Sequence, residues 1–240
     1  MDDALEGVRS HYRATGLTER LKTALAVFGP EDQRLTPQQL APLDQFHTRG
    51  IAASADLAGL AGISADMSVL DVGSGVGGPA RLLAATTGCR VTGVDLSEPF
   101  VEAARYLTER TGQGGQVTFE AASALALPFG DGLFDAVLLQ HVAMNIFDRP
   151  RLYREIRRVL KRSGRFATYD VVSTGAELHY PVPWARTAAT SFLLSAAATR
   201  EAIEQAGFRT LVWQDDSETA KPGSSACARP GRRRRPIWAW

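Results

Sequence analysis

The stretch VLDVGSGVGGPARLLA, residues 69–84, decides the fold of this 240-residue chain. Its apolar start, Val69–Val72, is typical of a buried strand, and its alanine- and leucine-rich end is typical of a helix. Between them lies a glycine-rich turn, and glycines let the backbone turn tightly and approach a ligand closely. The stretch therefore predicts a nucleotide-like ligand bound beyond the carboxyl end of the first strand.

Strand and helix patterns alternate from this stretch to residue 215. Such alternation predicts an α/β fold in which a doubly wound, mostly parallel sheet is covered by helices on both faces. The predicted strands are 69–72, 90–96, 116–121, 133–140, 165–172 and 209–215, and the helices between them are 79–86, 98–111, 149–162 and 199–208.

The same patterns divide the chain into three parts. Residues 1–66 are helical in pattern and predict an N-terminal cap or lid. Residues 67–215 form the main domain, with an insert at 173–198 after the fifth strand, and loops in such places often carry binding residues. Residues 216–240 lack apolar periodicity and predict an irregular, disordered tail.

The tail has six cations and no acid over residues 221–240. The rest of the chain is therefore mildly acidic, which argues against a nucleic-acid surface. The pattern is lost abruptly after about Thr219, which is also typical of a coding sequence translated out of frame.

The composition is typical of a globular protein, with 45% hydrophobic and 22% charged residues. No apolar run approaches the ~20 residues of a membrane helix. The acidic start MDDALEG lacks the pattern of a signal peptide. Cys89 and Cys227 have no metal-ligand spacing and favour a reducing, cytoplasmic compartment. We expect no metal site, no membrane contact and a small-molecule partner; a homodimer is an open possibility.

Asp71 distinguishes two ligand classes that share the glycine pattern. Gly73, Gly75 and Gly78 also fit the G-x-G-x-x-G of dinucleotide enzymes, and Asp95 is placed to bind ribose hydroxyls in either class. A dinucleotide would bring a pyrophosphate beside the Asp71 carboxylate, and two like charges at ~4 Å repel by about 4 kcal/mol at an effective dielectric near 20. S-adenosylmethionine carries an ammonium, a sulfonium and no phosphate, so it would be attracted.

Four segments resemble successive motifs of the class I S-adenosylmethionine-dependent methyltransferases. They are VLDVGSGVGGPARLLA, VTGVDLSEPFVEAAR, ALPFGDGLFDAVLLQHVAMNI and VLKRSGRFATYDVV, in the family's order and spacing. Over about residues 8–215 the chain is most similar to small-molecule enzymes of the ubiquinone/menaquinone-methyltransferase and sarcosine/dimethylglycine N-methyltransferase-like group, with a methyltransferase type 11 domain. The resemblance implies methyl transfer from S-adenosylmethionine to a nitrogen, oxygen or carbon of a small molecule.

The resemblance also implies roles for the matching residues, which follow the carboxyl ends of the first four strands. The methionine part of the cofactor would lie on Gly73, Ser74 and Gly75, with its ammonium at Asp71. The ribose would bind Asp95, and the adenine would lie between Leu96, Ser97, Ala122 and Ser123. The reactive methyl would lie beside Gln140 and His141. From the cap, Tyr12 is a candidate lid residue, and Gln45 could reach the cofactor or acceptor.

His141 is the candidate base, because an imidazole titrates near neutral pH. The alternative is that it only shapes the pocket or binds backbone. The remaining candidates for the acceptor pocket are His47, Met144, His179, Tyr180 and Trp184, each of which could instead be a packing, hinge or surface residue.

The chain departs from the family pattern at the cofactor site, at Ser163-Gly164 (usually Gly-Gly) and at the end of the sheet. Ala122-Ser123-Ala124 replaces the usual Gly-Asp-Ala, which predicts weaker cofactor binding, because a hydrogen bond to a charged group is worth ~1.5–3 kcal/mol. The family also closes its sheet with an antiparallel hairpin, and here the sixth strand lacks its partner. A catalytically impaired cofactor-binding or interaction protein is therefore an alternative. An NAD(P)-dependent oxidoreductase is less favoured.

Overall fold

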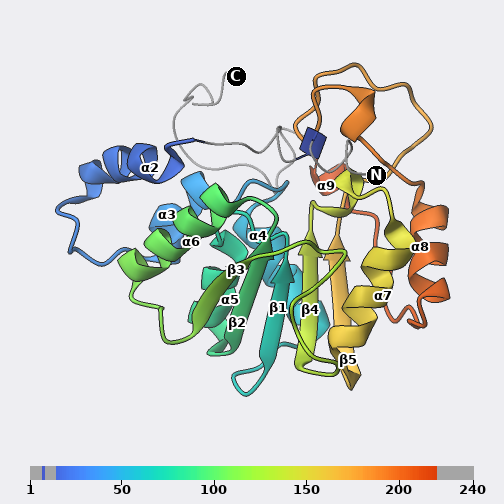
Figure 1. The fold of residues 1–240 in the computed structure, drawn as a ribbon, viewed down its shortest axis with the longest axis horizontal. Coiled ribbons are helices and arrows are strands. Elements are labelled where there is room, and N and C mark those ends of the chain that lie inside the picture. Colours follow the sequence, from blue (N-terminus) through green and yellow to red (C-terminus); the bar gives the residue numbers. More distant parts are fainter. Residues whose placement is uncertain (1–6, 9–14, 221–240) are drawn as a thin grey trace.

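The sheet of this chain is parallel throughout. The structure, a computed structural model, describes residues 7–8 and 15–220, so Tyr12 and most of the tail lie outside the described residues. The strands are β1 (Ser68–Val72), β2 (Arg90–Asp95), β3 (Val117–Ala121), β4 (Phe134–Gln140) and β5 (Leu160–Tyr169). They pair in the order β3-β2-β1-β4-β5 (Figure 1), which confirms the predicted fold class.

β1 lies at the centre of the sheet. It pairs with β2 on one side and with β4 on the other, so that Asp71 lies opposite both Gly93 and Leu138. The chain moves outward from β1 to β3 and then crosses back to β4, so strand order reverses between β1 and β4. Ligands of doubly wound folds bind at such a reversal, outside the carboxyl ends of the strands.

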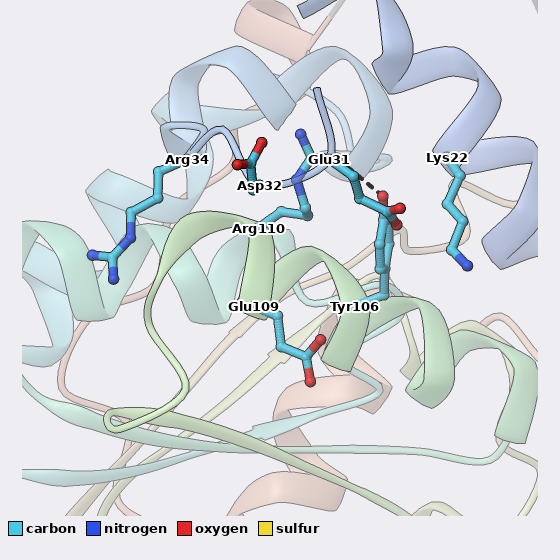
Figure 2. Close-up of a pocket in the computed structure, with 7 residues that line it drawn as sticks. All are labelled: Lys22, Glu31, Asp32, Arg34, Tyr106, Glu109 and Arg110. Carbon is cyan, nitrogen blue, oxygen red and sulfur yellow. Dashed lines mark hydrogen bonds between the residues drawn. The ribbon is translucent and has the colours of Figure 1, made fainter. Parts of the chain in front are cut away.

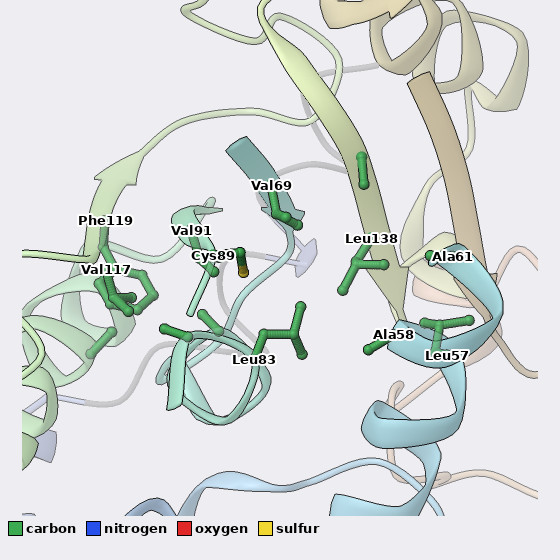
Figure 3. Close-up of a cluster of buried hydrophobic side chains, with 14 of the residues drawn as sticks. Leu57, Ala58, Ala61, Val69, Leu83, Cys89, Val91, Val117, Phe119 and Leu138 are labelled. Carbon is green, nitrogen blue, oxygen red and sulfur yellow. The ribbon is translucent and has the colours of Figure 1, made fainter. Parts of the chain in front are cut away.

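The sheet buries both faces because its central strands are apolar on both sides. Val69, Val91 and Leu138 point to one face, where α4 (Ile51–Ala61), α5 (Gly78–Thr87) and α6 (Glu98–Thr111) supply the facing side chains (Figure 3). Leu70 and Leu139 point to the other face, which α7 (Arg149–Val159) and α8 (Ala196–Gln205) cover. This period of two is the ordinary alternation of a strand.

The other helices surround this core. Within the cap, α2 (Leu17–Leu25), η1 (Ala26–Phe28) and α3 (Pro37–Asp44) precede α4. α3 begins with a capping box, in which Thr36 and Gln39 exchange hydrogen bonds. The short turns η2 (Ala143–Asn145) and η3 (Ala188–Thr190) follow β4 and β5. Across the described residues, no helix is long and apolar enough to cross a bilayer.

The predicted sixth strand is wrong. Residues 209–215 form no strand, and Leu211 and Trp213 are 67% and 42% exposed. A strand must share its backbone hydrogen bonds with a neighbour, and the described residues contain no partner strand for the expected hairpin. β5 is consequently an edge strand within the described part of the sheet.

Several element boundaries also differ from the prediction. α7 ends at Val159 rather than 162, because Leu160 is buried and already pairs with Phe134 in the sheet, so β5 begins at Leu160 rather than 165. At the start of the tail, Ser217–Ala220 forms the short helix α9 instead of irregular chain. Asp216 ties this segment to the cap through an ion pair of 2.5 Å with Arg49.

Candidate active site at the carboxyl ends of the strands

The glycine turn is held against the end of β2. The amides of Gly73 and Ser74 both donate to the Val94 carbonyl, at 2.7 and 2.9 Å. Gly73 has a φ of 73°, and a Cβ at this position would lie 2.2 Å from a Val142 methyl. Only glycine satisfies both the left-handed backbone and this close approach.

Asp95 joins the turn to the start of α6. Its Oδ2 accepts a hydrogen bond from the Gly75 amide and its Oδ1 accepts one from the Ser97 amide, both at 2.9 Å. Burial raises the pKa of Asp95, and the amide hydrogen bonds oppose that rise. Each carboxylate oxygen retains lone-pair capacity for a further donor, such as a ribose hydroxyl.

Asp71 is a buried carboxylate that lacks a full set of partners. It is 2% exposed, and neither its Oδ2 nor the nearby Ser74 hydroxyl oxygen has a hydrogen-bond partner. Burial, and secondly the charge of Asp95, raise the pKa of Asp71 to about 7. A buried, unpaired carboxylate is costly, so this position favours a ligand that brings a positive charge.

The predicted adenine-binding residues also lie at this edge. The Ala122 amide donates to the Asp95 carbonyl at 2.9 Å, which brings the end of β3 beside the end of β2. The Ser123 hydroxyl accepts from the Leu125 amide at 3.2 Å and so stabilises its own turn. Leu96 and Ser97 lead from Asp95 into α6. The structure therefore brings these residues together around Asp95.

A second polar cluster joins the cap to the end of β4. Its centre is the fully buried Ser54 of α4, whose hydroxyl lies 3.2 Å from Gln45 Oε1, 3.0 Å from His47 Nε2 and 3.3 Å from Gln140 Oε1. The Gln140 amide nitrogen is buried without a partner. Three predicted site residues thus meet at Ser54, which the sequence reasoning missed. A serine on the buried face of the largely apolar helix IAASADLAGLA was the available signal.

His141 lies at the edge of this cluster. Its φ is 54°, its amide donates to the Tyr169 carbonyl at 2.8 Å, and its ring centroid is 6.0 Å from that of His47 and 5.3 Å from that of Tyr169. Burial, and secondly His47, lower the pKa of His141 to about 4. Burial also lowers the pKa of His47. His141 is therefore neutral at pH 7.

The tautomer of His47 follows from its neighbours. Its Nε2 lies 3.0 Å from the Gly50 carbonyl, which can only accept. Nε2 therefore carries the proton. The Ser54 hydroxyl can then accept from His47 and donate its single proton to the Gln140 or the Gln45 side chain.

The predicted acceptor pocket is attached to the turn after β4. The Met144 carbonyl accepts from the Phe192 amide at 2.7 Å, and the Asn145 amide donates to the carbonyls of Trp184 and Thr190 at 2.8 and 3.1 Å. Figure 1 shows the insert 173–198, in orange, above the ends of β4 and β5.

The predicted acceptor residues differ in their surroundings. Met144 is buried, and Trp184 is half-buried with its indole N–H on Ser191 Oγ at 3.0 Å. Tyr180 is also half-buried, whereas His179 is exposed. The structure therefore joins the turn that carries Met144 to the Trp184 backbone through Asn145, and it leaves His179 on the surface of the insert.

A cavity of about 440 Å³ lies elsewhere, between α2, the loop before α3 and the C-terminal half of α6 (Figure 2). α6 runs away from the strand ends after Ser97, so this cavity is remote from Asp95. Its lining has equal numbers of cations and acids, which are Lys22, Arg34, Arg110, Glu31, Asp32 and Glu109, together with Tyr106. Among the described residues, the cavity lining included, no group of three His, Cys, Asp or Glu side chains could hold a metal ion.

Comparison with known proteins identifies the region around the glycine turn. Residues 70–168 match the model of a family described as "Methyltransferase domain". These residues are a methyltransferase domain. Its five-stranded parallel sheet and flanking helices have the class I, S-adenosylmethionine-dependent methyltransferase fold.

Three similar proteins give the extent of this likeness. The chain is 34% identical over 174 residues to sterol 24-C-methyltransferase of Eremothecium gossypii (69% of this chain, 46% of that protein). It is 35% identical over 171 residues to methyltransferase GfsG of Streptomyces halstedii (68% and 60%). The crystal structure of the [4+2]-cyclase SpnF is 27% identical with a TM-score of 0.63, covering 71% of this chain and 60% of SpnF. The chain thus spans about half the length of the curated relatives named here.

Proposed function

We propose that this chain binds S-adenosylmethionine at the strand ends and transfers its methyl group to a small-molecule acceptor. The observation that carries the proposal is the Asp71 carboxylate, which is 2% exposed and has an unpartnered oxygen beside the glycine turn. The cofactor's ammonium would neutralise this carboxylate, whereas the pyrophosphate of NAD(P) would be repelled by it. The same observation disfavours the oxidoreductase alternative.

The residues present fit the cofactor at several points. Asp95 has lone-pair capacity for the ribose hydroxyls, and the Ser74 hydroxyl and the Gln140 amide nitrogen are buried polar atoms without partners. No atom lies within 4 Å of a Cβ built on Gly75, so the turn is open on that side. The Ser123 hydroxyl stands where relatives have an acid for the adenine amino group, so adenine binding rests on fewer charged contacts.

The chemistry at the site requires alignment more than activation by the protein. When bound, S-adenosylmethionine supplies an electrophilic methyl group on a positively charged sulfur, and the departing electron pair returns to that sulfur. The turn and Asp95 fix the position of the donor, and the cap residues around Ser54 exclude water. Neutral His141 is the candidate acceptor for a proton leaving the nucleophile, which is a nitrogen, an oxygen or an activated carbon, but its lowered pKa makes it a weaker base than an exposed imidazole.

The acceptor side favours an apolar molecule. Phe147 is 72% exposed and packs edge-to-face on Phe192 of the insert, with ring centroids 5.5 Å apart. Phe147 lies in the turn between β4 and α7, and the pockets of small-molecule ligands are lined mostly by apolar and aromatic side chains. The name of the sterol 24-C-methyltransferase relative supports the same class of acceptor.

The proposal excludes nucleic acid as a substrate and places the chain in the cytoplasm, in accord with the free, buried thiol of Cys89.

A second candidate function is cofactor binding without methyl transfer. The observations that favour it are the similarity to SpnF, which is named as a cyclase, and the position of β5 at the edge of the sheet that the described residues form. A fold does not determine the reaction that its site performs.

Methyl transfer is tested with S-adenosylmethionine labelled in its methyl group. The purified chain is incubated with a panel of isoprenoid, polycyclic and macrocyclic alcohols and alkenes, and with small polar amines, and labelled products are separated by chromatography. The proposal predicts a labelled product from an apolar acceptor and none from the Asp95→Ala variant. Binding of the cofactor without any labelled product would favour the second candidate, and product formation from the polar amines alone would contradict the apolar acceptor.

A further inference from the structure

Arg81 is a wholly buried arginine one turn after the glycine turn. Its Nη2 donates to the Val76 carbonyl at 2.6 Å and to Asp44 Oδ2 at 2.9 Å. Its Nη1 donates to the Ala104 carbonyl and the Thr108 hydroxyl of α6, both at 3.2 Å. The guanidinium therefore binds the glycine turn, the cap and α6 at once.

The partner carboxylate stands at the end of the cap helix α3. Asp44 is 3% exposed and directly precedes the segment Gln45–His47. Its backbone also touches the first residue of α5, since a Cβ on Gly78 would lie 2.2 Å from the Asp44 carbonyl oxygen. The φ of Gly78 is not positive, so its backbone conformation alone does not require glycine. Glycine is needed at this position because the two backbones approach each other closely.

A short chain of contacts leads from this ion pair to the candidate active site. Gln45 follows Asp44 and contacts Ser54 Oγ at 3.2 Å, and Ser54 contacts Gln140 at the end of β4 at 3.3 Å. His47 contacts the same hydroxyl at 3.0 Å. The cap residues of the site are thus fixed at one end by Asp44 and at the other by Ser54.

The ion pair is poorly arranged for stability alone. Asp44 Oδ1 and Arg81 Nε are both buried without a hydrogen-bond partner. A buried pair with unsatisfied atoms contributes little to folding compared with apolar residues of similar size, and its best-attested use is to specify one arrangement of the chain.

We propose that Arg81 and Asp44 are a positioning pair, which holds the cap segment Gln45–His47 against the glycine turn so that both halves of the cofactor site keep one geometry. The inference rests on the proposed function, because the ligand whose site it positions is S-adenosylmethionine. Neither side chain touches the reacting atoms. Their effect is on how tightly the cap and the turn close around the cofactor.

The test compares an apolar replacement of the pair with a matched control. The variant is Asp44→Leu with Arg81→Met, and the control is Arg110→Met. Arg110 is likewise buried, at 6% exposed, but it donates to the carbonyls of Pro30 and Gln33 beside the remote cavity. Affinity for S-adenosylhomocysteine is measured by calorimetry, and backbone hydrogen exchange of residues 45–54 is measured without ligand.

The proposal predicts that the double variant unfolds cooperatively but binds S-adenosylhomocysteine at least about tenfold more weakly, with faster exchange over residues 45–54. The control changes affinity less than about threefold. If the double variant does not fold, Asp44→Asn gives the same readouts, since it keeps the size of the side chain and the Arg81 contact to Val76. Unchanged affinity and unchanged exchange would overturn the proposal. Absence of binding by the wild type would instead refute the proposed cofactor, and the exchange of residues 45–54 would then decide the positioning role by itself.

Discussion

The hydroxyl of Ser54 contacts the Gln140 side chain at 3.3 Å, which links the cap helix α4 to the end of β4. Ser54→Ala would leave Gln140 and Gln45 without this buried partner, and an unpaired buried polar group costs about 1–3 kcal/mol. We expect a lower free energy of unfolding by that amount and about fivefold to tenfold weaker binding of S-adenosylhomocysteine. Denaturant unfolding and calorimetry measure the two effects.

The matched control for this variant is Ser64→Ala. Ser64 is exposed at the turn after α4, and exposed substitutions usually change stability by less than about 0.5 kcal/mol. Equal effects of Ser54→Ala and Ser64→Ala would show that the Ser54 cluster does not shape the site.

Gly73 and Gly75 should respond differently to alanine. Both have positive φ, of 73° and 54°, so either substitution costs about 1–2 kcal/mol in backbone strain. At Gly73 the new Cβ also meets Val142, which adds about 1–3 kcal/mol, whereas at Gly75 it meets no protein atom within 4 Å. Thermal unfolding should therefore show a much larger loss for Gly73→Ala.

Ligand binding should nevertheless be lost in both glycine variants. In Gly75→Ala the new methyl group would occupy the open side of the turn, where the cofactor would lie. In Gly73→Ala the clash with Val142 would displace the turn that binds the cofactor. A Gly75→Ala protein that is folded and binds S-adenosylhomocysteine as the wild type does would place the cofactor elsewhere.

Cofactor affinity should increase with pH up to about 7. The pKa of Asp71 is raised to about 7 in the free protein, and the ligand's ammonium requires the ionised carboxylate. Below this pKa a proton must leave on binding, so the association constant for S-adenosylhomocysteine rises by up to about tenfold per pH unit and then levels off. Calorimetry between about pH 5 and pH 8 measures the slope. The same slope in Asp71→Asn would assign it to another group.

The burial of neutral His141 should lower the free energy of unfolding in acid. Its pKa in the folded protein is lowered to about 4 from the ordinary 6.5. Between these values the unfolded chain takes up a proton that the folded chain does not, so the contribution of His141 is complete above pH 6.5 and is lost as the pH falls toward 4. The loss reaches at most about 1.4 kcal/mol per pH unit.

The control for this effect is His141→Asn, because asparagine tolerates the left-handed backbone at this position. The carboxyl groups of Asp71 and Asp170, whose pKa values are raised, titrate in both proteins. The difference between the two stability curves therefore isolates His141. A difference that is constant with pH would mean that His141 is not buried in neutral form.

The insert should loosen when Asn145 is replaced. The Asn145 amide donates to the carbonyls of Trp184 and Thr190 at 2.8 and 3.1 Å, so Asn145→Ala removes two of the hydrogen bonds that attach residues 173–198 to the turn after β4 and leaves the one between Phe192 and Met144. Limited proteolysis should cut within the insert several-fold faster, while S-adenosylhomocysteine affinity changes little. Unchanged cleavage would show that the insert is held by other contacts.

Local patterns predicted the parts of the molecule that local chemistry determines. The glycine turn, Asp95 and the five parallel strands follow from apolar runs and glycines close in sequence. The ion pair of Asp44 with Arg81 joins residues 37 positions apart, so no local sequence pattern predicts it. Ser54 resembled an ordinary small residue of an apolar helix. Residues 209–215 had the pattern of a strand but not the neighbour that a strand requires, and Leu160 belonged to the sheet although it continued the pattern of α7.

The central claim is that the strand ends bind S-adenosylmethionine through Asp71 and Asp95. It is tested most directly by calorimetric titration of the full chain with S-adenosylhomocysteine, beside NADH and the Asp95→Ala variant. The account predicts micromolar binding of S-adenosylhomocysteine to the wild type, at least about tenfold weaker binding to Asp95→Ala, and no binding of NADH. A cooperatively folding wild type that binds NADH, or that binds S-adenosylhomocysteine no better than Asp95→Ala does, would contradict it.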